Sequence, residues 1–420
     1  MERIRIRGNH ALQLKGRVKI SGSKNAVLPA IAASLLTQEK IRLSNIPRVK
    51  DVFTILTLMK ELGATYELDQ NSLWIETSNL DSREASYELV RSMRASILVL
   101  GPLLARFGQA VVALPGGCAI GSRPIDLHLH GLEKMGASFV LEHGYIKAEA
   151  KQLRGAEVHF DKKTVGGTEN LIMAATLADG ETVLSNCALE PEITNLCELL
   201  IKMGAEIEGA GTETIQIKGS KALAGAEHEI IPDRIETGTF LLAGALTRGD
   251  ILIEDCRPGH LTTVIEKLRY SGARIQEIQN RTLHVVGSPD IKPQDITTSP
   301  YPGFPTDMQA QFMVLMTQAL GTSIITETIF DRRFSHVNEL LRLGASIEVQ
   351  GDKATVKGKT LLSGAETIAT DLRASASLVL AGLIAGGETM INDVEHLDRG
   401  YERIEEKLKV LGASIERIKL

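Results

Sequence analysis

One segment of the chain combines a thiol, several glycines and a cation, a set of groups that can carry chemistry. It reads Pro115-Gly116-Gly117-Cys118-Ala119-Ile120-Gly121-Ser122-Arg123-Pro124. Glycine lets a backbone approach a ligand closely, and a nearby guanidinium favours a thiolate or binds an anion. A buried cysteine in a glycine-rich turn fits the same residues, because free cysteine is among the most buried residue types. No adjacent histidine or aspartate completes a nucleophile pair, so the segment alone leaves both interpretations open.

Polar and basic residues recur just before six apolar segments that are expected to be helices. They are Ser23-Lys24-Asn25, Arg91 and Arg94, Lys163-Thr164 with Thr168-Glu169-Asn170, Asp233-Arg234-Glu236-Thr237, Thr306-Asp307, and Asp371-Arg373. A helix N-terminus offers unpaired N–H groups and the positive end of a dipole, so it attracts anions. Serine, threonine and aspartate are also ordinary N-caps, and solvated cations are common. The sixfold repetition favours a cleft between domains for a small ligand that carries phosphate and carboxylate groups.

Further charged loops are expected after the second strand of several parts of the chain. They contain Arg123, Arg257-Pro258-Gly259-His260, Asp331-Arg332-Arg333 and Asp398-Arg399-Gly400. The chain has no P-loop, dinucleotide-binding glycine pattern or His-Glu-x-x-His, so kinase, dehydrogenase and zinc-protease chemistry lack their parts. His128 and His130 form a His-x-His pair, but neither a third ligand nor a carboxylate cluster accompanies them. We expect neither a metal nor an organic cofactor.

The composition is that of an ordinary globular protein. Its 420 residues, 43% of them hydrophobic, suggest two or three domains. A net charge of -5 and 4% aromatic residues argue against a nucleic-acid partner. Four cysteines, at 118, 187, 197 and 256, match no metal or disulfide spacing, as expected in a reducing compartment. With no signal-peptide core, and a longest apolar run (97–105) too short for a bilayer, we expect a soluble, cytoplasmic protein without a membrane partner.

A short phrase repeats six times along the chain. Its copies are Leu62-Gly63-Ala64, Met135-Gly136-Ala137, Met203-Gly204-Ala205, Ser271-Gly272-Ala273, Leu343-Gly344-Ala345 and Leu411-Gly412-Ala413, with glycines 73, 68, 68, 72 and 68 residues apart. Such even spacing indicates a sixfold internal repeat. A helical pattern precedes each copy and an alternating pattern follows it. Each glycine is therefore predicted to end a helix and lead into a strand.

Each repeat also contains an earlier, more apolar segment. These segments span 26–36, 95–107, 170–178, 239–247, 308–320 and 374–385, and they are hydrophobic nearly all round, which is typical of buried helices. The predicted order is strand, buried helix, strand, amphipathic helix, Gly-Ala, strand. Repeats of about 70 residues are too small for strong separate cores. We predict an α/β fold with one three-repeat domain at 21–229, and a second at 1–20 and 230–420 that the strand at 3–7 closes.

Four motifs together resemble one known family. They are Ser21-Gly22-Ser23-Lys24-Asn25-Ala26, Pro115-Gly116-Gly117-Cys118 through Arg123-Pro124-Ile125-Asp126-Leu127-His128, Pro302-Gly303-Phe304-Pro305-Thr306-Asp307, and Asp371-Leu372-Arg373. With the sixfold period, the whole chain resembles the UDP-N-acetylglucosamine enolpyruvyl transferases. The resemblance implies a two-domain inside-out α/β barrel of six βαβαββ-like repeats. It also implies transfer of enolpyruvyl from phosphoenolpyruvate to the 3-hydroxyl of UDP-N-acetylglucosamine, with phosphate released by addition and elimination, as the first committed step of bacterial peptidoglycan synthesis.

The resemblance also implies residue roles. Addition to an enol double bond needs an acid and a base; Cys118 is the expected acid and covalent holder of phosphoenolpyruvate, and Asp307 the expected base. Guanidinium and ammonium groups suit its phosphate and carboxylate. The expected phosphoenolpyruvate site contains Lys24, Asn25, Arg123, Arg333, Arg373 and Arg399, of which Lys24 and Arg399 are also counted as catalytic. The expected nucleotide-sugar site contains Asn25, Arg94, Arg123, Pro124, Ile125, Asp126, Leu127, Lys163, Thr164, Val165, Gly166, Asp307 and Ile329.

Two other functions remain open. 5-Enolpyruvylshikimate-3-phosphate synthase shares the expected architecture, but it is not expected to have the Cys118 segment or the Lys24-Asn25 context. A non-catalytic paralogue could bind the nucleotide sugar as a sensor, and the presence of Cys118 and Asp307 argues against it. The resemblance further implies a part in cell-wall biogenesis, cell shape, the cell cycle and division, and inhibition by the phosphonate epoxide fosfomycin.

Overall fold

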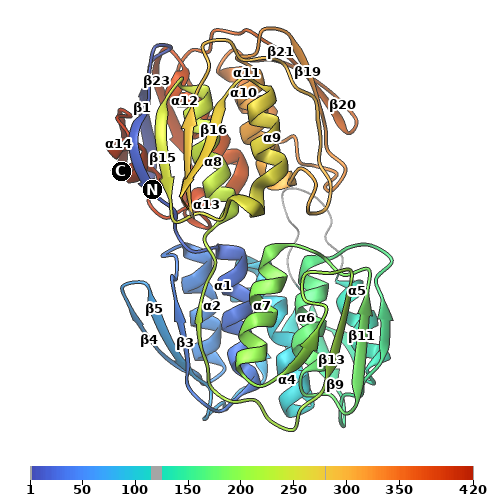
Figure 1. The fold of residues 1–420 in the computed structure, drawn as a ribbon. Coiled ribbons are helices and arrows are strands. Elements are labelled where there is room, and N and C mark those ends of the chain that lie inside the picture. Colours follow the sequence, from blue (N-terminus) through green and yellow to red (C-terminus); the bar gives the residue numbers. More distant parts are fainter. Residues whose placement is uncertain (1, 115–124, 280, 420) are drawn as a thin grey trace. The chain divides into compact units, whose positions relative to one another are not determined.

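The chain divides into two compact units in the computed structural model, which describes residues 2–114, 125–279 and 281–419 (Figure 1). Of these residues, unit 1 holds 2–21 and 232–419, and unit 2 holds 22–114 and 125–231. Each unit contains three four-stranded sheets and its own hydrophobic core. None of the helices in the described ranges is long and apolar enough to cross a membrane.

One repeat shows the architecture of all six. It runs β10 (Glu157–His159), α6 (Val165–Ala175), β11 (Glu181–Ser185), α7 (Pro191–Lys202), β12 (Glu206–Glu208) and β13 (Thr214–Lys218). The sheet order is β10-β11-β13-β12, in which β10 and β11 are parallel and the other pairs antiparallel. The six sheets share this order, so the chain is a βαβαββ repeat as predicted.

The remaining elements follow the same plan. In unit 2 they are α1 (Lys24–Ala33), the 3-10 helix η1 (Ser34–Leu36), β3 (Ile41–Ser44), α2 (Lys50–Glu61), β4 (Thr65–Asp69), β5 (Ser72–Glu76), β6 (Glu84–Ala85), α3 (Tyr87–Ser92), η2 (Arg94–Val99), α4 (Leu100–Phe107), β7 (Gln109–Ala113), α5 (Asp126–Lys134), β8 (Ser138–Glu142), β9 (Tyr145–Glu149) and β14 (Glu227–Glu229). In unit 1 they are β1 (Glu2–Gly8), β2 (Lys15–Lys19), α8 (Arg234–Leu246), β15 (Asp250–Glu254), η3 (Pro258–Leu261), α9 (Thr262–Tyr270), β16 (Arg274–Gln279), β17 (Thr282–Val286), β18 (Ile296–Thr297), η4 (Thr306–Met308), α10 (Gln309–Met316), β19 (Thr322–Thr326), α11 (Val337–Arg342), β20 (Ser346–Gln350), β21 (Lys353–Lys357), β22 (Glu366–Ile368), α12 (Leu372–Ile384), β23 (Gly387–Asn392), α13 (Glu395–Asp398), α14 (Ile404–Val410) and β24 (Ile415–Lys419).

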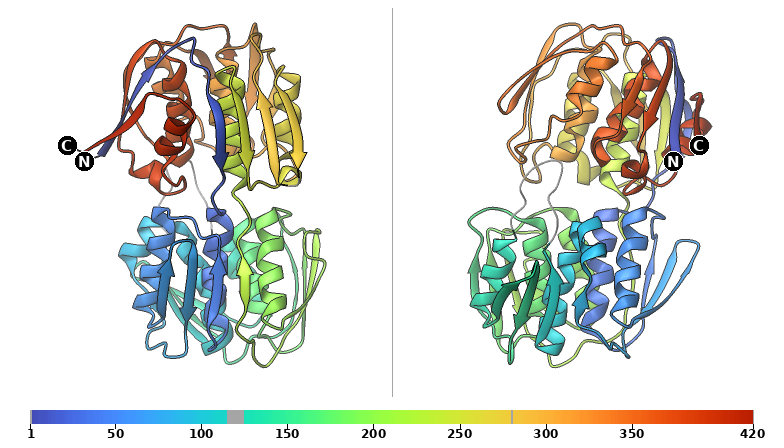
Figure 2. Two further views of the ribbon diagram at one scale, coloured as in Figure 1. Left: turned by 60° about the vertical axis from the view of Figure 1, so that its left-hand side comes forward. Right: turned by 180° about the vertical axis from the view of Figure 1, so that it is seen from behind.

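The apolar segments form the interior of each unit. They became α1, α4, α6, α8, α10 and α12, and every residue of α10 is buried. In unit 1, α8, α10 and α12 pack against one another, and in unit 2 α6 packs against both α1 and α4. Within each unit, the sheets lie outside these helices (Figures 1 and 2). The predicted α/β fold with helices inside is confirmed.

Three strands complete sheets that are remote in the sequence. The N-terminal strand β1 pairs antiparallel with both β23 and β24, and so completes the last repeat of unit 1. β2 precedes α1 of unit 2 but pairs with β15 of unit 1, and β14 precedes α8 of unit 1 but pairs with β3 of unit 2. The chain therefore passes between units after the leading strand of a repeat.

The six repeated glycines end helices as predicted. Their φ angles lie between +89° and +106°, a region that L side chains rarely adopt. In the first repeat, the Gly63 N–H donates to the Lys60 carbonyl at 3.0 Å, and the Ala64 N–H donates to the Met59 carbonyl at 2.9 Å. These two hydrogen bonds satisfy carbonyls at the end of α2, and the chain then turns into β4.

Candidate functional site

Asp307 lies between two buried arginines in unit 1. Its Oδ1 accepts a hydrogen bond from Arg333 Nη2 at 2.8 Å, and its Oδ2 accepts one from Arg373 Nη2 at 3.0 Å. The arginine side chains are 3% and 5% exposed, against 27% for Asp307. The structure thus brings together three residues predicted for the site. One carboxylate thus pairs with two guanidinium groups that have lost almost all contact with water.

Arg373 is held at both ends of its side chain. Arg373 lies in the first turn of α12, where the N-cap Asp371 accepts hydrogen bonds from the Arg373 and Ala374 N–H groups. Its guanidinium carbon lies 5.5 Å from the centre of the Tyr401 ring. Burial alone lowers the pKa of Arg373, but Asp307, followed by other nearby groups, raises it above its ordinary value. The group is therefore a fixed cation.

A buried glutamate fixes the loop that carries Arg333. Glu327 is 4% exposed, and its carboxylate accepts hydrogen bonds from two hydroxyl groups and two backbone N–H groups. One hydroxyl belongs to Thr306, beside Asp307, and one N–H belongs to Ile329, which was predicted for the nucleotide-sugar site. Glu327 therefore ties the Ile329 loop to η4.

Arg399 lies at the C-cap of α13 and is half-buried. Two residues later, the Tyr401 side chain is buried, and its hydroxyl lies 2.8 Å from Thr239 Oγ1 and 3.3 Å from Gln311 Nε2. The sequence singled out Arg399 but missed Tyr401. Its position two residues after a predicted anion ligand was the available signal.

Lys24 forms a second buried ion pair, in unit 2. It is the first residue of α1, after the N-cap Ser23, whose hydroxyl accepts a hydrogen bond from the Ala26 N–H at 3.3 Å. Lys24 Nζ lies 3.4 Å from Asp51 Oδ2, and the two side chains are 13% and 4% exposed. Asn25 follows in α1 and is half-buried. Asp51, in the first turn of α2, was missed because nothing in its spacing from Lys24 marks it.

The start of α6 collects another group of predicted residues. Thr164 is its N-cap and accepts a hydrogen bond from the Gly167 N–H at 3.2 Å; Val165 and Gly166 follow as its first residues. Lys163 Nζ donates to the Cys187 carbonyl at 3.1 Å and to Glu213 Oε1 at 2.8 Å. Since Glu213 is mostly exposed, this ion pair is more open than those of Lys24 and Asp307.

His128 joins the start of α5 to the start of α6. A Cβ added to Gly166 would lie 3.3 Å from His128 Cε1, and His128 Nδ1 lies 3.1 Å from Asn170 Nδ2. Burial, and then the charge of Arg94, lower the pKa of His128 to about 4. The imidazole is therefore a neutral hydrogen-bonding group next to Arg94, not a cation.

The predicted residues Ile125, Asp126 and Leu127 form the N-cap and first turn of α5, directly before His128. Unit 2 thus places Arg94, the 125–127 turn and Gly166 at the start of α6 around one histidine. Cys118, Arg123 and Pro124 lie outside the described residues.

Comparisons with known proteins assign the chain to a family. A family model described as EPSP synthase (3-phosphoshikimate 1-carboxyvinyltransferase) matches residues 9–408. A UDP-N-acetylglucosamine 1-carboxyvinyltransferase of Koribacter versatilis is 56% identical, over 100% of this chain and 97% of its own length. The enzyme of that name from Desulfosudis oleivorans is also 56% identical, over the full length of both chains. This chain belongs to the enolpyruvyl transferases.

Solved structures agree with this family. The crystal structure of the enolpyruvyl transferase NikO from Streptomyces tendae has a TM-score of 0.90 at 25% identity, and covers 100% of this chain and 99% of its own. An EPSP synthase from Acinetobacter baumannii has a TM-score of 0.76 over the full length of both chains, and its 19% identity supports the fold alone. The protein is therefore an enzyme with the inside-out α/β barrel fold of the enolpyruvyl transferases.

Among the described residues, no three histidine, cysteine or acidic side chains form a group that could hold a metal. Cys187, Cys197 and Cys256 are free and buried, and burial raises the pKa of Cys187 to about 11 and that of Cys197 to about 12. These thiols are therefore poor nucleophiles.

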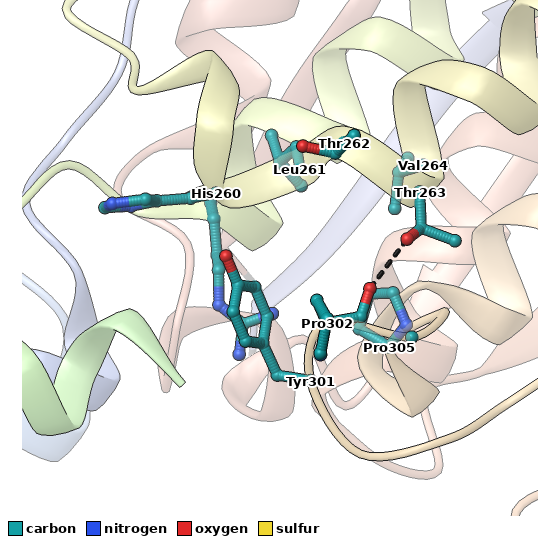
Figure 3. Close-up of a pocket in the computed structure, with 10 residues that line it drawn as sticks. His260, Leu261, Thr262, Thr263, Val264, Tyr301, Pro302 and Pro305 are labelled. Atoms are coloured by element: carbon teal, nitrogen blue, oxygen red, sulfur yellow. Dashed lines mark hydrogen bonds between the residues drawn. The ribbon is translucent and has the colours of Figure 1, made fainter. Parts of the chain in front are cut away.

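A small pocket in unit 1 is lined by Arg234 and His260 together with Tyr301 and the 302–305 turn (Figure 3). The Thr263 hydroxyl donates to the Pro302 carbonyl at 2.6 Å and closes one side of the pocket. Burial, followed by Arg257 and Arg234, lowers the pKa of His260 to about 4. The pocket therefore carries guanidinium charge and a neutral imidazole.

Proposed function

We propose that the protein transfers the enolpyruvyl group of phosphoenolpyruvate to the 3-hydroxyl of UDP-N-acetylglucosamine and releases phosphate. The observation that carries this proposal is the match to UDP-N-acetylglucosamine 1-carboxyvinyltransferases at 53% to 56% identity over essentially the whole chain. The reaction is the first committed step of peptidoglycan synthesis, so the protein serves cell-wall growth, shape and division. Its free thiols suit the reducing cytoplasm.

The bond changes define the groups that the site needs. The sugar 3-oxygen bonds to C2 of phosphoenolpyruvate and loses its proton to a base, while an acid adds a proton to C3. The adduct then loses a proton from C3 and the phosphate from C2, which leaves the enol ether. We assign Asp307 as the base and Cys118 as the acid, which also forms the covalent adduct; a fosfomycin-type epoxide would alkylate this thiol.

The anionic parts of the substrates suit the buried cations. We assign Lys24, Asn25, Arg123 and Arg399 to the phosphate, and Arg333 or Arg373 to the carboxylate. The guanidinium groups of Arg333 and Arg373 both donate hydrogen bonds to Asp307. A substrate carboxylate that pairs with one of them therefore removes one hydrogen bond from the assigned base.

The nucleotide sugar is assigned to the groups around His128 and to the Asp307 region. The residues are Asn25, Arg94, Arg123, Pro124, Ile125, Asp126, Leu127, Lys163, Thr164, Val165, Gly166, Asp307 and Ile329. The Arg94 and Lys163 cations and the N–H groups at the start of α6 suit a diphosphate.

Phosphate release from phosphoenolpyruvate tests the proposal. We expect release with UDP-N-acetylglucosamine and none with shikimate 3-phosphate or without an acceptor. Asp307→Asn should lower kcat by at least about 100-fold, while Asp352→Asn, at the exposed β20–β21 turn, should retain it. Release only with shikimate 3-phosphate would favour the rival enzyme. Binding of the nucleotide sugar without any release would favour a sensor.

A further inference from the structure

Tyr401 connects three helices at the centre of unit 1. Its side chain is 2% exposed, and its backbone N–H donates to the Leu397 carbonyl of α13 at 3.0 Å. Gln311 Nε2 of α10 donates to its hydroxyl at 3.3 Å. Because the Thr239 hydroxyl of α8 already donates to the Ile235 carbonyl, the Tyr401 hydroxyl donates to Thr239 Oγ1. The ring therefore has one fixed position.

The face of this ring meets the Arg373 guanidinium. The 5.5 Å separation lies within the range of cation–π attraction, which strengthens when both groups have lost water. Arg373 and Tyr401 are both buried, and Arg373 also donates a hydrogen bond to Asp307 Oδ2. Asp233 is the further charge that acts on both residues. The guanidinium thus contacts both a carboxylate and an aromatic face.

We propose that Tyr401 is a positioning residue that aims Arg373 at the Asp307 carboxylate and at the anionic substrate. The proposal rests on the proposed function, in which Arg373 serves phosphoenolpyruvate. Tyr401 also fixes the backbone two residues after Arg399, so one anchored ring supports two anion ligands. If Tyr401 positions Arg373 through cation–π attraction, phosphoenolpyruvate binding should depend on the electron density of the ring. If the ring only fills space, binding should not depend on it.

Fluorination separates these two roles, because fluorine weakens the negative face of a ring with little change in size. The test uses Tyr401→Phe as the parent, and then phenylalanines at 401 that carry one, two or three fluorines. We expect kcat/KM for phosphoenolpyruvate to fall stepwise, by roughly 3- to 30-fold across the series. The KM for UDP-N-acetylglucosamine should stay constant. The same series at Tyr270, which is 65% exposed, is the matched control and should be flat.

A flat series at position 401 would overturn the proposal. If the phenylalanine parent does not fold, a single ring fluorine on Tyr401 keeps the bonds to Thr239 and Gln311 and gives a one-step comparison with the wild type. Calorimetric Kd values for phosphoenolpyruvate provide a readout without turnover. If the wild type releases no phosphate, the proposed function fails, but the dependence of Kd on fluorination still tests the role of Tyr401, and a constant Kd refutes it.

Discussion

Removing the charge of Asp307 should destabilise unit 1 strongly. Asp307→Asn keeps the shape of the side chain but removes the carboxylate that pairs with both Arg333 and Arg373, which are 3% and 5% exposed. Breaking a buried ion pair from one side typically costs about 3–5 kcal/mol. The amide oxygen can still accept one hydrogen bond, and Asp307 itself is 27% exposed, so we expect about 3 kcal/mol. For a unit of roughly 210 residues, this lowers Tm by about 6–12 °C.

Differential scanning calorimetry with added phosphate tests the reasoning. Phosphate should bind the unpaired arginines of Asp307→Asn, and ten times its Kd should restore about 1.4 kcal/mol, or roughly 3–6 °C. The wild type should gain less, because Asp307 competes with phosphate. Asp352→Asn, which removes an exposed carboxylate, should change stability by under about 0.5 kcal/mol. An Asp307→Asn Tm at or above the wild-type value would refute the argument, since it would mean that the carboxylate is strained.

Three further predictions concern single residues. Cys118→Asp should keep appreciable phosphate release and Cys118→Ser should lose most of it, because the proton donor to carbon must be an acid near neutral pH. The pKa of His128 falls from 6.5 to about 4 on folding, so between these pH values only the unfolded chain gains a proton, and stability drops as the pH falls. In urea unfolding, the free energy of unfolding should therefore fall between neutral pH and pH 5 by roughly 2 kcal/mol more for wild type than for His128→Gln. Gly204 and Gly259 both have open space for a Cβ, but only Gly204 has a positive φ, of +98°; Gly204→Ala should therefore cost about 1–2 kcal/mol in urea unfolding and Gly259→Ala under about 0.5.

The repeat could be predicted because its signals are local. A left-handed glycine after an amphipathic helix, as at Gly63, and an all-apolar segment such as α10 are decided by neighbouring residues. The pairing of β2 with β15, and of β14 with β3, could not be predicted in this way. A leading strand can pair with either of two equivalent sheets, and the alternation of its residues contains no information on which one it joins.

The site residues were predicted by type, but their pairing was not. Helix starts and charge identified Lys24, Asp307 and Arg373, whose buried side chains require counter-charges. The partner of Lys24 is 27 residues away and that of Arg373 is 66 residues away. Only the packing of α1 against α2, and of α10 against α12, brings these charges together.

These ion pairs compete with any anion that binds to Lys24 or Arg373. Lys24 and Arg373 are already paired with carboxylates of the chain, so a ligand gains only the difference between its own bonds and those of Asp51 or Asp307. A phosphate dianion has more charge and more acceptor oxygens than a carboxylate, so it can win this exchange at Lys24, which we assign to the phosphate. In the proposed reaction, the substrate carboxylate that takes Arg373 removes a cation from Asp307, the assigned base, and a carboxylate that loses a neighbouring cation becomes a stronger base. We therefore expect anion binding at Arg373 and activation of the assigned base to be coupled.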